Sequence, residues 1–237
     1  MTGIGLLYLS GTKFLSSYPS FSTLTNQLGG LVIVSVALAA LWDLGGKRAF
    51  AEEIRENINV KHEITVSGLE SIGTDYSKIV DWDAALSSAI RLDIFAAWAT
   101  TWRNTHQAKL VDMTSRPDAR IRAILPDPND QPSVEILATR FNMPASAVRT
   151  KLSEAIADYK RLDENNATGK VEIYTSRVFR AFTAYRVDDR FIVTLYHHKD
   201  SRSGSVPAVS CRRGGTLHEF FSDDLEGVIN ASTKVYP

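Results

Sequence analysis

Two short stretches of this sequence combine side chains that can bind or attack a phosphate group. The first is TTWRNTH, Thr100 to His106. Thr101 or Asn104 can cap a helix there, and Trp102 can stack on a base or ring. Arg103 can pair with a phosphate or a carboxylate. We predict a ligand-binding site at these four residues, and a capped helix with Trp102 in the core remains the alternative.

The second stretch is YHHK, residues 196–199, in which His197, His198 and Lys199 follow one another. Adjacent residues on a strand face opposite sides, so one histidine of the pair would point into a pocket. We therefore add His197 to the predicted ligand-binding residues. His197 with Lys199 could also supply a nucleophile and a cation for phosphodiester cleavage, and a polar strand end in solvent explains the same letters.

Other chemistry finds little support in the sequence. The single cysteine, Cys211, excludes an intramolecular disulfide and is too little for a thiolate zinc site. Beyond one adjacent pair, the five histidines lack the spacing of metal ligands. They are His62, His106, His197, His198 and His218. We predict no metal site and no cofactor.

The charge balance bears on nucleic-acid binding. Lys and Arg together number 27, and Asp and Glu also number 27, so the formal net charge is zero. A neutral chain lacks the broad positive field on which non-specific binding to nucleic acid relies. We therefore expect no bulk nucleic-acid binding, although a local basic pocket is compatible with this balance.

The N-terminal part is predicted to contact a membrane. Leu28–Leu44 is almost wholly apolar, and the uncharged Thr23–Gln27 can lengthen it toward the roughly 20 residues that a spanning helix needs. Trp42 suits the interfacial region, and Lys47 with Arg48 beyond it favours a cytoplasmic C-terminal domain. A buried core helix is the alternative.

We divide the chain into three parts. Residues 1–46 form the membrane segment with its main span at 28–44, residues 47–74 form a juxtamembrane helix and linker, and residues 75–237 form a soluble domain. In that domain helical and strand periodicities alternate. The predicted strands are Leu92–Thr100, Ala119–Leu125, Val171–Tyr174, Phe179–Arg186, Phe191–Leu195 and Val206–Ser210. The predicted helices are Trp82–Arg91, Arg103–Ser115, one around Val148–Tyr159, and Leu217–Ile229.

One hairpin of this domain carries a family resemblance. VFRAFTAYRVDDRFIVTLYHHK, Val178 to Lys199, reads as two strands joined at Asp188-Asp189. With AIRLDIFAAWATTW and RPDARIRAILPDP before it, this layout resembles one half of the phospholipase D fold, from about Asp75 to Ala231. The resemblance implies an α/β fold, namely a single phospholipase D-like half domain with helices on both faces of a mixed β-sheet, preceded by a transmembrane helix.

The resemblance also implies which residues would do chemistry. The family motif is H-x-K-x(4)-D, in which the histidine attacks phosphorus and the lysine neutralises phosphate charge. With Asp188 at the aspartate position, Ala181 and Thr183 stand where the histidine and the lysine would be. A shift by one residue gives Phe182 and Ala184 instead. We therefore predict no catalytic residues in the hairpin, and a structural role for Asp188 in the turn.

Together these features predict a membrane-anchored binding, sensor or effector protein rather than an enzyme. We place it at the bacterial inner membrane with its C-terminal domain in the cytoplasm, in stress or phage-defence signalling. The expected partners are the membrane through residues 28–44, a phosphorylated small molecule or nucleotide, and a second copy of the chain. One alternative is a phosphodiesterase or nuclease whose site has moved to His197 and Lys199 or is completed by dimerisation. Another is a purely structural membrane scaffold.

Overall fold

The computed structural model describes residues 2–13, 18–47, 52, 60–164, 168–178, 181–195 and 206–237. The chain forms two compact units, Met1–His62 and Glu63–Pro237. The three hydrophobic clusters of the structure draw all their residues from positions 76–236, so the second unit has a core of its own.

The first unit contains one long apolar helix. α3 (Pro19–Leu41) continues into the π-helical turn η1 (Trp42–Gly46). The candidate span Pro19–Gly45 has 27 residues, and an 18-residue window within it has a mean hydropathy of 2.0. At 1.5 Å per residue it is about 40 Å long, enough to cross a hydrocarbon core of about 30 Å. The predicted apolar helix is confirmed and begins earlier than Leu28, and its length and composition suit a membrane span or a signal sequence.

A short helix, α1 (Thr2–Ser10), packs against α3. The contact depends on glycine, because a Cβ atom on Gly29 would lie 2.9 Å from Leu7 Cγ and 3.0 Å from the Gly3 carbonyl oxygen. Small residues allow this kind of close backbone approach between apolar helices. Nine residues extend only about 14 Å, so α1 is too short to cross a bilayer by itself.

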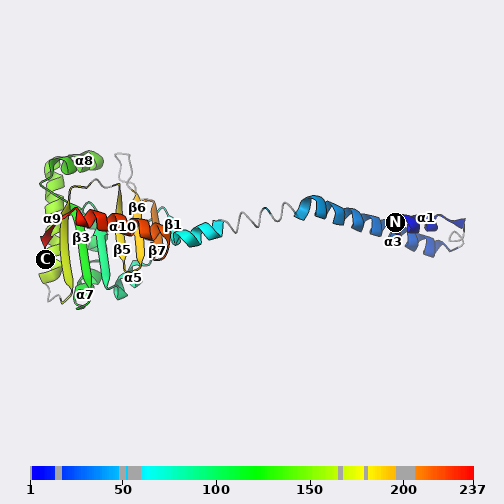
Figure 1. The fold of residues 1–237 in the computed structure, drawn as a ribbon, viewed down its shortest axis with the longest axis horizontal. Helices are drawn as coiled ribbons and strands as arrows, with labels where there is room; N and C mark the ends of the chain where they lie inside the picture. Colours follow the sequence, from blue (N-terminus) through cyan, green and yellow to red (C-terminus); the bar gives the residue numbers. More distant parts are fainter. Residues whose placement is uncertain are drawn as a thin grey trace. The chain divides into compact units, whose positions relative to one another are not determined.

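The second unit is built on an eight-stranded mixed sheet with the order β1-β7-β6-β5-β2-β3-β4-β8 (Figure 1). The neighbours β2, β3 and β4 run parallel, and all the other pairs are antiparallel. The strands are β1 (Leu69–Gly73), β2 (Arg91–Phe95), β3 (Arg120–Pro126), β4 (Lys170–Ser176), β5 (Phe182–Val187), β6 (Arg190–Leu195), β7 (Ala208–Arg212) and β8 (Thr233–Tyr236).

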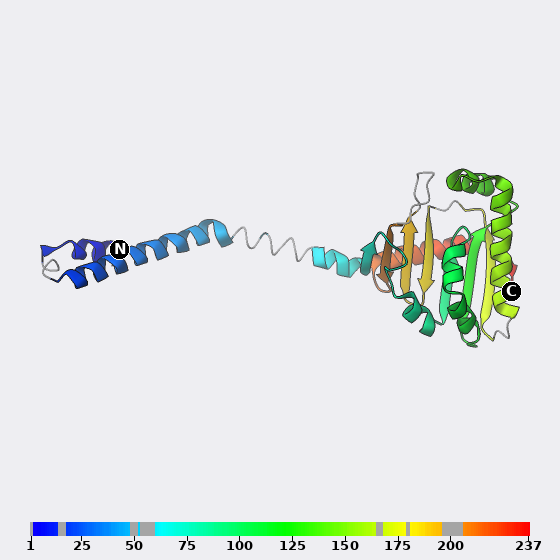
Figure 2. The same ribbon diagram turned by 180° about the vertical axis from the view of Figure 1, so that it is seen from behind.

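Helices cover both faces of this sheet. α10 (Thr216–Asn230) crosses the face of the sheet that is seen in Figure 1. The other face, which is turned toward the viewer in Figure 2, is covered by several helices. These are α5 (Trp82–Ser88), α6 (Thr100–Thr105), α7 (Gln107–Thr114) and α9 (Ala145–Glu164). α8 (Gln131–Phe141) follows β3 and packs on α9. The predicted fold class, a mixed α/β sheet with helices on both faces and an apolar N-terminal helix, is confirmed.

Periodic apolar residues explain how these layers hold together. Val148, Leu152 and Tyr159 lie on one side of α9 and are fully buried. On the opposite face of the sheet, Leu225 of α10 packs with Phe191 of β6. Burying a side chain of this size contributes about 1.5–3 kcal/mol, and each face of the sheet has its own cluster of such residues.

Cys211 lies in this second core. Its side chain has no exposed surface, and its Sγ atom lies 3.7 Å from the Phe191 carbonyl oxygen. Burial, and then the negative charge of Glu70, raise the pKa of the thiol to about 11.

The structure departs from the predicted elements at several places. Strand β2 ends at Phe95 instead of Thr100. Ala99 adopts a left-handed conformation with φ 48° and is the N-cap residue of the short helix α6. The single helix predicted at Arg103–Ser115 is two helices that meet at His106. Helix α8 and strand β8 were not predicted, and residues 69–73, which we assigned to the linker, form the edge strand β1.

Candidate functional site

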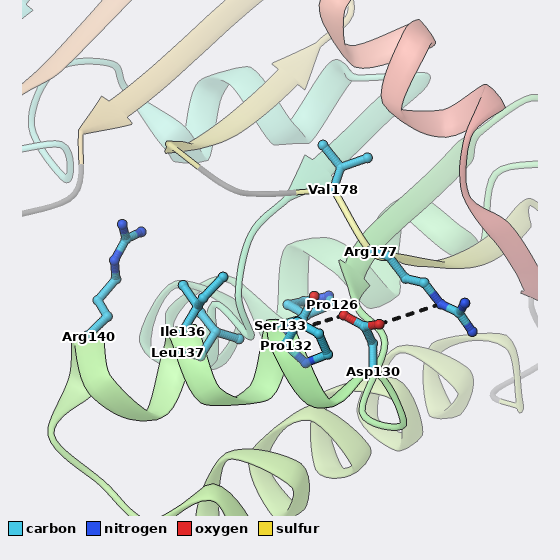
Figure 3. A pocket seen from close by; sticks show the side chains of 9 residues that line it. All are labelled: Pro126, Asp130, Pro132, Ser133, Ile136, Leu137, Arg140, Arg177 and Val178. Atoms are coloured by element: carbon cyan, nitrogen blue, oxygen red, sulfur yellow. Dashed lines mark hydrogen bonds and ion pairs between the residues drawn. The ribbon is translucent and has the colours of Figure 1, made fainter.

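A hollow opens where the parallel strands β3 and β4 end (Figure 3). The hollow is open to solvent, and its volume is about 420 Å³ when the adjoining solvent space is included. β3 contributes Pro126, the segment after β4 contributes Arg177 and Val178, and α8 supplies most of the rest. The lining residues are Pro126, Asp130, Pro132, Ser133, Ile136, Leu137, Arg140, Arg177 and Val178. In sheets with parallel strands, ligands bind at this carboxyl edge.

The lining combines an apolar patch with two cationic side chains. Ile136, Leu137 and Val178 offer carbon atoms, whereas Arg140 and Arg177 stand at opposite ends of the lining (Figure 3). Pockets for small molecules usually have this composition, with a largely apolar wall and a few polar groups that fix the ligand's orientation. The hollow therefore suits a ligand with an apolar body and an anionic group.

Arg177 is held only loosely at the rim. Its Nε atom lies 3.4 Å from Asp127 Oδ2 and 3.8 Å from Asp130 Oδ1, and its side chain is 75% exposed. Exposed ion pairs of this kind are weak. Asp130 has a second task, because it caps α8 by accepting a hydrogen bond from the Ser133 backbone N–H at 3.0 Å. The hydrogen bonds from Ser133 lower the pKa of Asp130. Arg177 can therefore turn toward an anion while the cap stays in place.

The predicted ligand-binding residues of the TTWRNTH stretch fall into two groups. Thr101 and Asn104 are exposed on α6, and Trp102 and Arg103 are buried. The ring of Trp102 packs edge-on against Trp82 at a centroid distance of 5.3 Å. The geometry of Trp102 is that of a core residue, and ligand binding at this stretch remains a prediction.

Arg103 of α6 connects this helix to α9 and to the segment that follows β2. Its Nη1 donates to the Trp98 carbonyl oxygen at 2.7 Å, and its Nη2 forms an ion pair with Asp158 of α9. Its guanidinium also lies over the ring of Tyr159, 5.3 Å from the centroid. Since the side chain is only 2% exposed, this arginine stabilises the contact between α6 and α9.

The β5–β6 hairpin has the predicted turn. Asp188 adopts φ 48°, and its Oδ1 accepts hydrogen bonds from the backbone N–H groups of Ile90 at 3.1 Å and Arg91 at 2.8 Å. Its carboxylate thus ties the turn to the beginning of β2. Ala181 is exposed and Thr183 is buried on β5. His197 and Lys199, the residues of the alternative catalytic reading, lie outside the described residues.

Sequence reasoning missed a buried charge cluster beneath α10, formed by Asp93, Arg122, Arg186 and Glu226. Asp93 of β2 has no exposed surface, and it accepts hydrogen bonds from Arg122 Nε at 2.5 Å and Arg186 Nε at 2.6 Å. Glu226 of α10 accepts from Arg122 Nη2 at 2.9 Å and also pairs with Arg186. The available signal was a charged residue inside otherwise apolar strands, as in RLDIF and RIRAIL.

The arginines control the protonation of both carboxylates. Burial alone would raise the pKa of Asp93, but hydrogen bonds from Arg122 and the charge of Arg186 hold it below its ordinary value. The same balance lowers the pKa of Glu226 to about 2. Both acids are therefore ionised at neutral pH, and the cluster joins three strands to one helix.

Comparison with known proteins gives structural likeness alone. No family model matches the chain, and no curated protein matches it. One similar structure is TrmBL2, an archaeal chromatin protein that shows a novel mode of DNA binding. It has a TM-score of 0.42 and 12% identity over 88% of this chain and 70% of that one. Another is Nuc from Salmonella typhimurium, a member of the phospholipase D family, with a TM-score of 0.38 and 12% identity over 70% of this chain and 99% of that one.

These likenesses bear on two predictions. A member of the phospholipase D family, which the sequence resembles, is among the similar structures. The expectation of no bulk nucleic-acid binding is contradicted, because another similar structure is a DNA-binding chromatin protein. That expectation used only the net charge of zero, which ignores how charges gather on one face, and it is withdrawn. At these scores the likenesses concern the fold, and neither neighbour's function is assigned to this chain.

Proposed function

We propose that this chain is a membrane-anchored binding protein whose second unit holds a phosphorylated small molecule without cleaving it. The observation that carries the proposal is the hollow at the carboxyl ends of β3 and β4, with Arg140 and Arg177 at its two ends. A phosphate group can accept charge-assisted hydrogen bonds from a guanidinium. The apolar part of the ligand would cover Ile136, Leu137 and Val178.

The absence of catalysis in this proposal is supported by the resemblance to the phospholipase D family. In the alignment that places Asp188 at the motif's aspartate, Ala181 and Thr183 take the positions of the histidine and the lysine. Neither side chain can form a phosphohistidine or neutralise a developing phosphate charge. The protein would therefore act as a receptor or sensor for its ligand.

Membrane anchorage is supported by the candidate span Pro19–Gly45. Lys47 and Arg48 follow this span in the sequence and favour a cytoplasmic second unit at a bacterial inner membrane. The full chain should sediment with membranes, resist extraction by high salt and dissolve in detergent. Recovery of the chain in the soluble fraction, or release of residues 63–237 by a signal peptidase, would contradict the anchor.

The ligand can be sought by calorimetry on the full chain in detergent, with nucleotides and cyclic nucleotides as probes. Arg177→Gln should weaken a ligand that wild type binds by roughly ten- to a hundredfold, because a hydrogen bond to a charged group contributes about 1.5–3 kcal/mol. Arg140→Gln should act in the same direction. Arg161→Gln, an exposed arginine of α9, is the matched control.

The outcomes of this experiment are distinct. No heat of binding with any phosphorylated probe, or equal binding by the Arg177→Gln and Arg161→Gln variants, would contradict the site. Hydrolysis of bis-p-nitrophenyl phosphate that disappears in a His197→Ala variant would replace the binding role with the enzymatic alternative.

The proposal includes a wider role in bacterial stress or phage-defence signalling, which rests on the layout of an anchor joined to a phospholipase D-like domain. At a given dose, phage should then form more plaques on host cells that lack the chain than on cells that carry it. Equal plaque counts across a phage panel would remove this part of the proposal.

A further inference from the structure

Three basic residues stand side by side on the face of the sheet that α10 covers in part. Arg91 of β2 lies directly opposite Arg120 of β3, and Arg120 lies directly opposite Lys170 of β4. Neighbouring strands are about 4.8 Å apart, so the three residues form a row roughly 10 Å long. We name Arg91, Arg120 and Lys170 the basic row.

The basic row belongs to the α10 face for a reason of geometry. Arg122 contacts Glu226 of α10, and side chains two residues apart on a strand share a face, so Arg120 points the same way as Arg122. Residues in register on neighbouring strands share a face as well, which places Arg91 and Lys170 with Arg120. Leu225 and Val228 of α10 pack near the C-terminal ends of these strands. The basic row lies at their N-terminal ends.

Charge is poorly balanced along this row. Like charges directly opposite each other destabilise a sheet. Arg91 shares Asp93 and Glu226 with the buried charge cluster. Within the ranges that the structure describes, neither Arg120 nor Lys170 forms an ion pair, and Lys170 is exposed.

Other charged residues surround the basic row. Burial, and then the positive charges of Arg186 and Arg122, lower the pKa of Arg91, against the opposing effect of Asp93. Lys234 of β8 adds a further cation and pairs with Glu172 at 2.9 Å. The cations on the strands of this face are Arg91, Arg120, Arg122, Lys170, Arg186 and Lys234, and the strand carboxylates belong to Asp93 and Glu172. α10 adds the carboxylates of Glu219, Asp223, Asp224 and Glu226, so the cations without an ion-pair partner in this set are Arg120 and Lys170 of the basic row.

We propose that the basic row is a docking surface for the anionic phosphate headgroups of a lipid bilayer. Charge complementarity supports this occupant, because Arg and Lys side chains that are not neutralised attract anionic lipid. The inference rests on the proposed anchorage for its choice of membrane over nucleic acid. A chain fixed in a bilayer meets headgroups at a high effective concentration, and weak contacts then suffice.

Docking of this kind would give the second unit a preferred orientation at the membrane. The basic row would contact the headgroups, and the hollow at the opposite ends of β3 and β4 would face away from them. A soluble ligand would thus reach the hollow from the aqueous side.

The test is co-sedimentation of the separate unit Glu63–Pro237, which has its own core, with lipid vesicles. Vesicles of phosphatidylcholine with about 30% phosphatidylglycerol are compared with pure phosphatidylcholine. The unit should bind the anionic vesicles, and salt should release it, because Debye screening weakens exposed charges. The double variant Arg120→Gln/Lys170→Gln should bind roughly thirtyfold more weakly, at about five- to sixfold per basic residue.

The control variant is Lys78→Gln/Lys109→Gln, which removes two cations on the side of the opposite core. Equal thermal unfolding of both double variants and the wild type shows that all of them fold. Equal binding to neutral and anionic vesicles, or equal loss in both double variants, would overturn the proposal. Tighter binding of the same unit to duplex DNA than to the anionic vesicles, lost in Arg120→Gln/Lys170→Gln, would overturn it in favour of nucleic acid. Each outcome is independent of the calorimetry that tests the hollow.

Discussion

The buried charge cluster and the rim of the hollow both use arginine, but they use it in opposite ways. In the cluster, Arg122 and Arg186 are each about 5% exposed and donate several hydrogen bonds to two carboxylates. At the rim, Arg177 is mostly exposed and makes only long contacts to Asp127 and Asp130. An arginine that is paired with carboxylates in the interior stabilises the fold, whereas one held weakly at a surface hollow can still change partner.

The sharpest way to break this comparison is to remove the charge at the centre of the cluster. Asp93→Asn should destabilise the second unit by about 3–5 kcal/mol, because two buried arginines lose the more deeply buried of the two carboxylates that they share. Urea unfolding followed by tryptophan fluorescence measures the change. Asp130→Asn is the matched control, since asparagine caps a helix as well as aspartate does. A loss below about 1 kcal/mol in Asp93→Asn would mean that the cluster is not structural.

A substitution of Arg103 tests whether a buried arginine outside the charge cluster also stabilises the fold. Arg103→Gln should cost about 1–3 kcal/mol of stability, because the Trp98 carbonyl and Asp158 lose a buried donor. Arg161→Gln removes an exposed partner of the same Asp158 and should change the stability by less than about 0.5 kcal/mol. If Arg103→Gln weakened a phosphorylated ligand while leaving the unfolding midpoint unchanged, Arg103 would belong with the binding residues instead.

Acid titration examines the same cluster through Glu226. The pKa of Glu226 in the folded chain, about 2, lies below the ordinary value of 4.5. Its contribution to stability is therefore complete above about pH 5 and is lost as the pH falls from there toward 2. Because this side chain is 40% exposed, solvent screening reduces the effect to about 1–2 kcal/mol. Unfolding measured from pH 7 to pH 3 should show a shallower loss in Glu226→Gln than in wild type, and parallel curves would contradict this.

The smallest effect is expected at the rim of the hollow. Arg177→Gln should change the stability by less than about 0.5 kcal/mol, because its ion pairs are long and exposed. Thermal unfolding without ligand measures this. A loss as large as that of Asp93→Asn would erase the distinction between the two kinds of arginine.

Periodicity explains why some of this molecule was predictable. The apolar spacing of Val148, Leu152 and Tyr159 predicted α9, and alternation predicted β3. Short edge strands were missed, since β1 and β8 depend on pairing with β7 and β4 more than on their own residues.

The candidate site was harder to predict than the fold. Its residues come from the end of β3, the helix α8 and the segment after β4, which only the sheet brings together. Residue type alone made Arg103 a candidate for binding an anion. In the structure it is buried and paired with Asp158, which lies 55 positions later in the chain. The sequence pattern indicates which side chains could hold an anion, and the tertiary packing determines which of them face solvent.

The buried thiol of Cys211 has a practical consequence for spectroscopy. A thiol must ionise to react with a maleimide or a methanethiosulfonate reagent, and one whose pKa is raised to about 11 and which has no exposed surface reacts slowly. Wild-type protein should therefore remain unlabelled, and a cysteine introduced at an exposed position would be the one reactive site. A spin label or fluorophore placed at Lys170 and another at Arg177 would then report separately how deeply each end of the sheet approaches a bilayer.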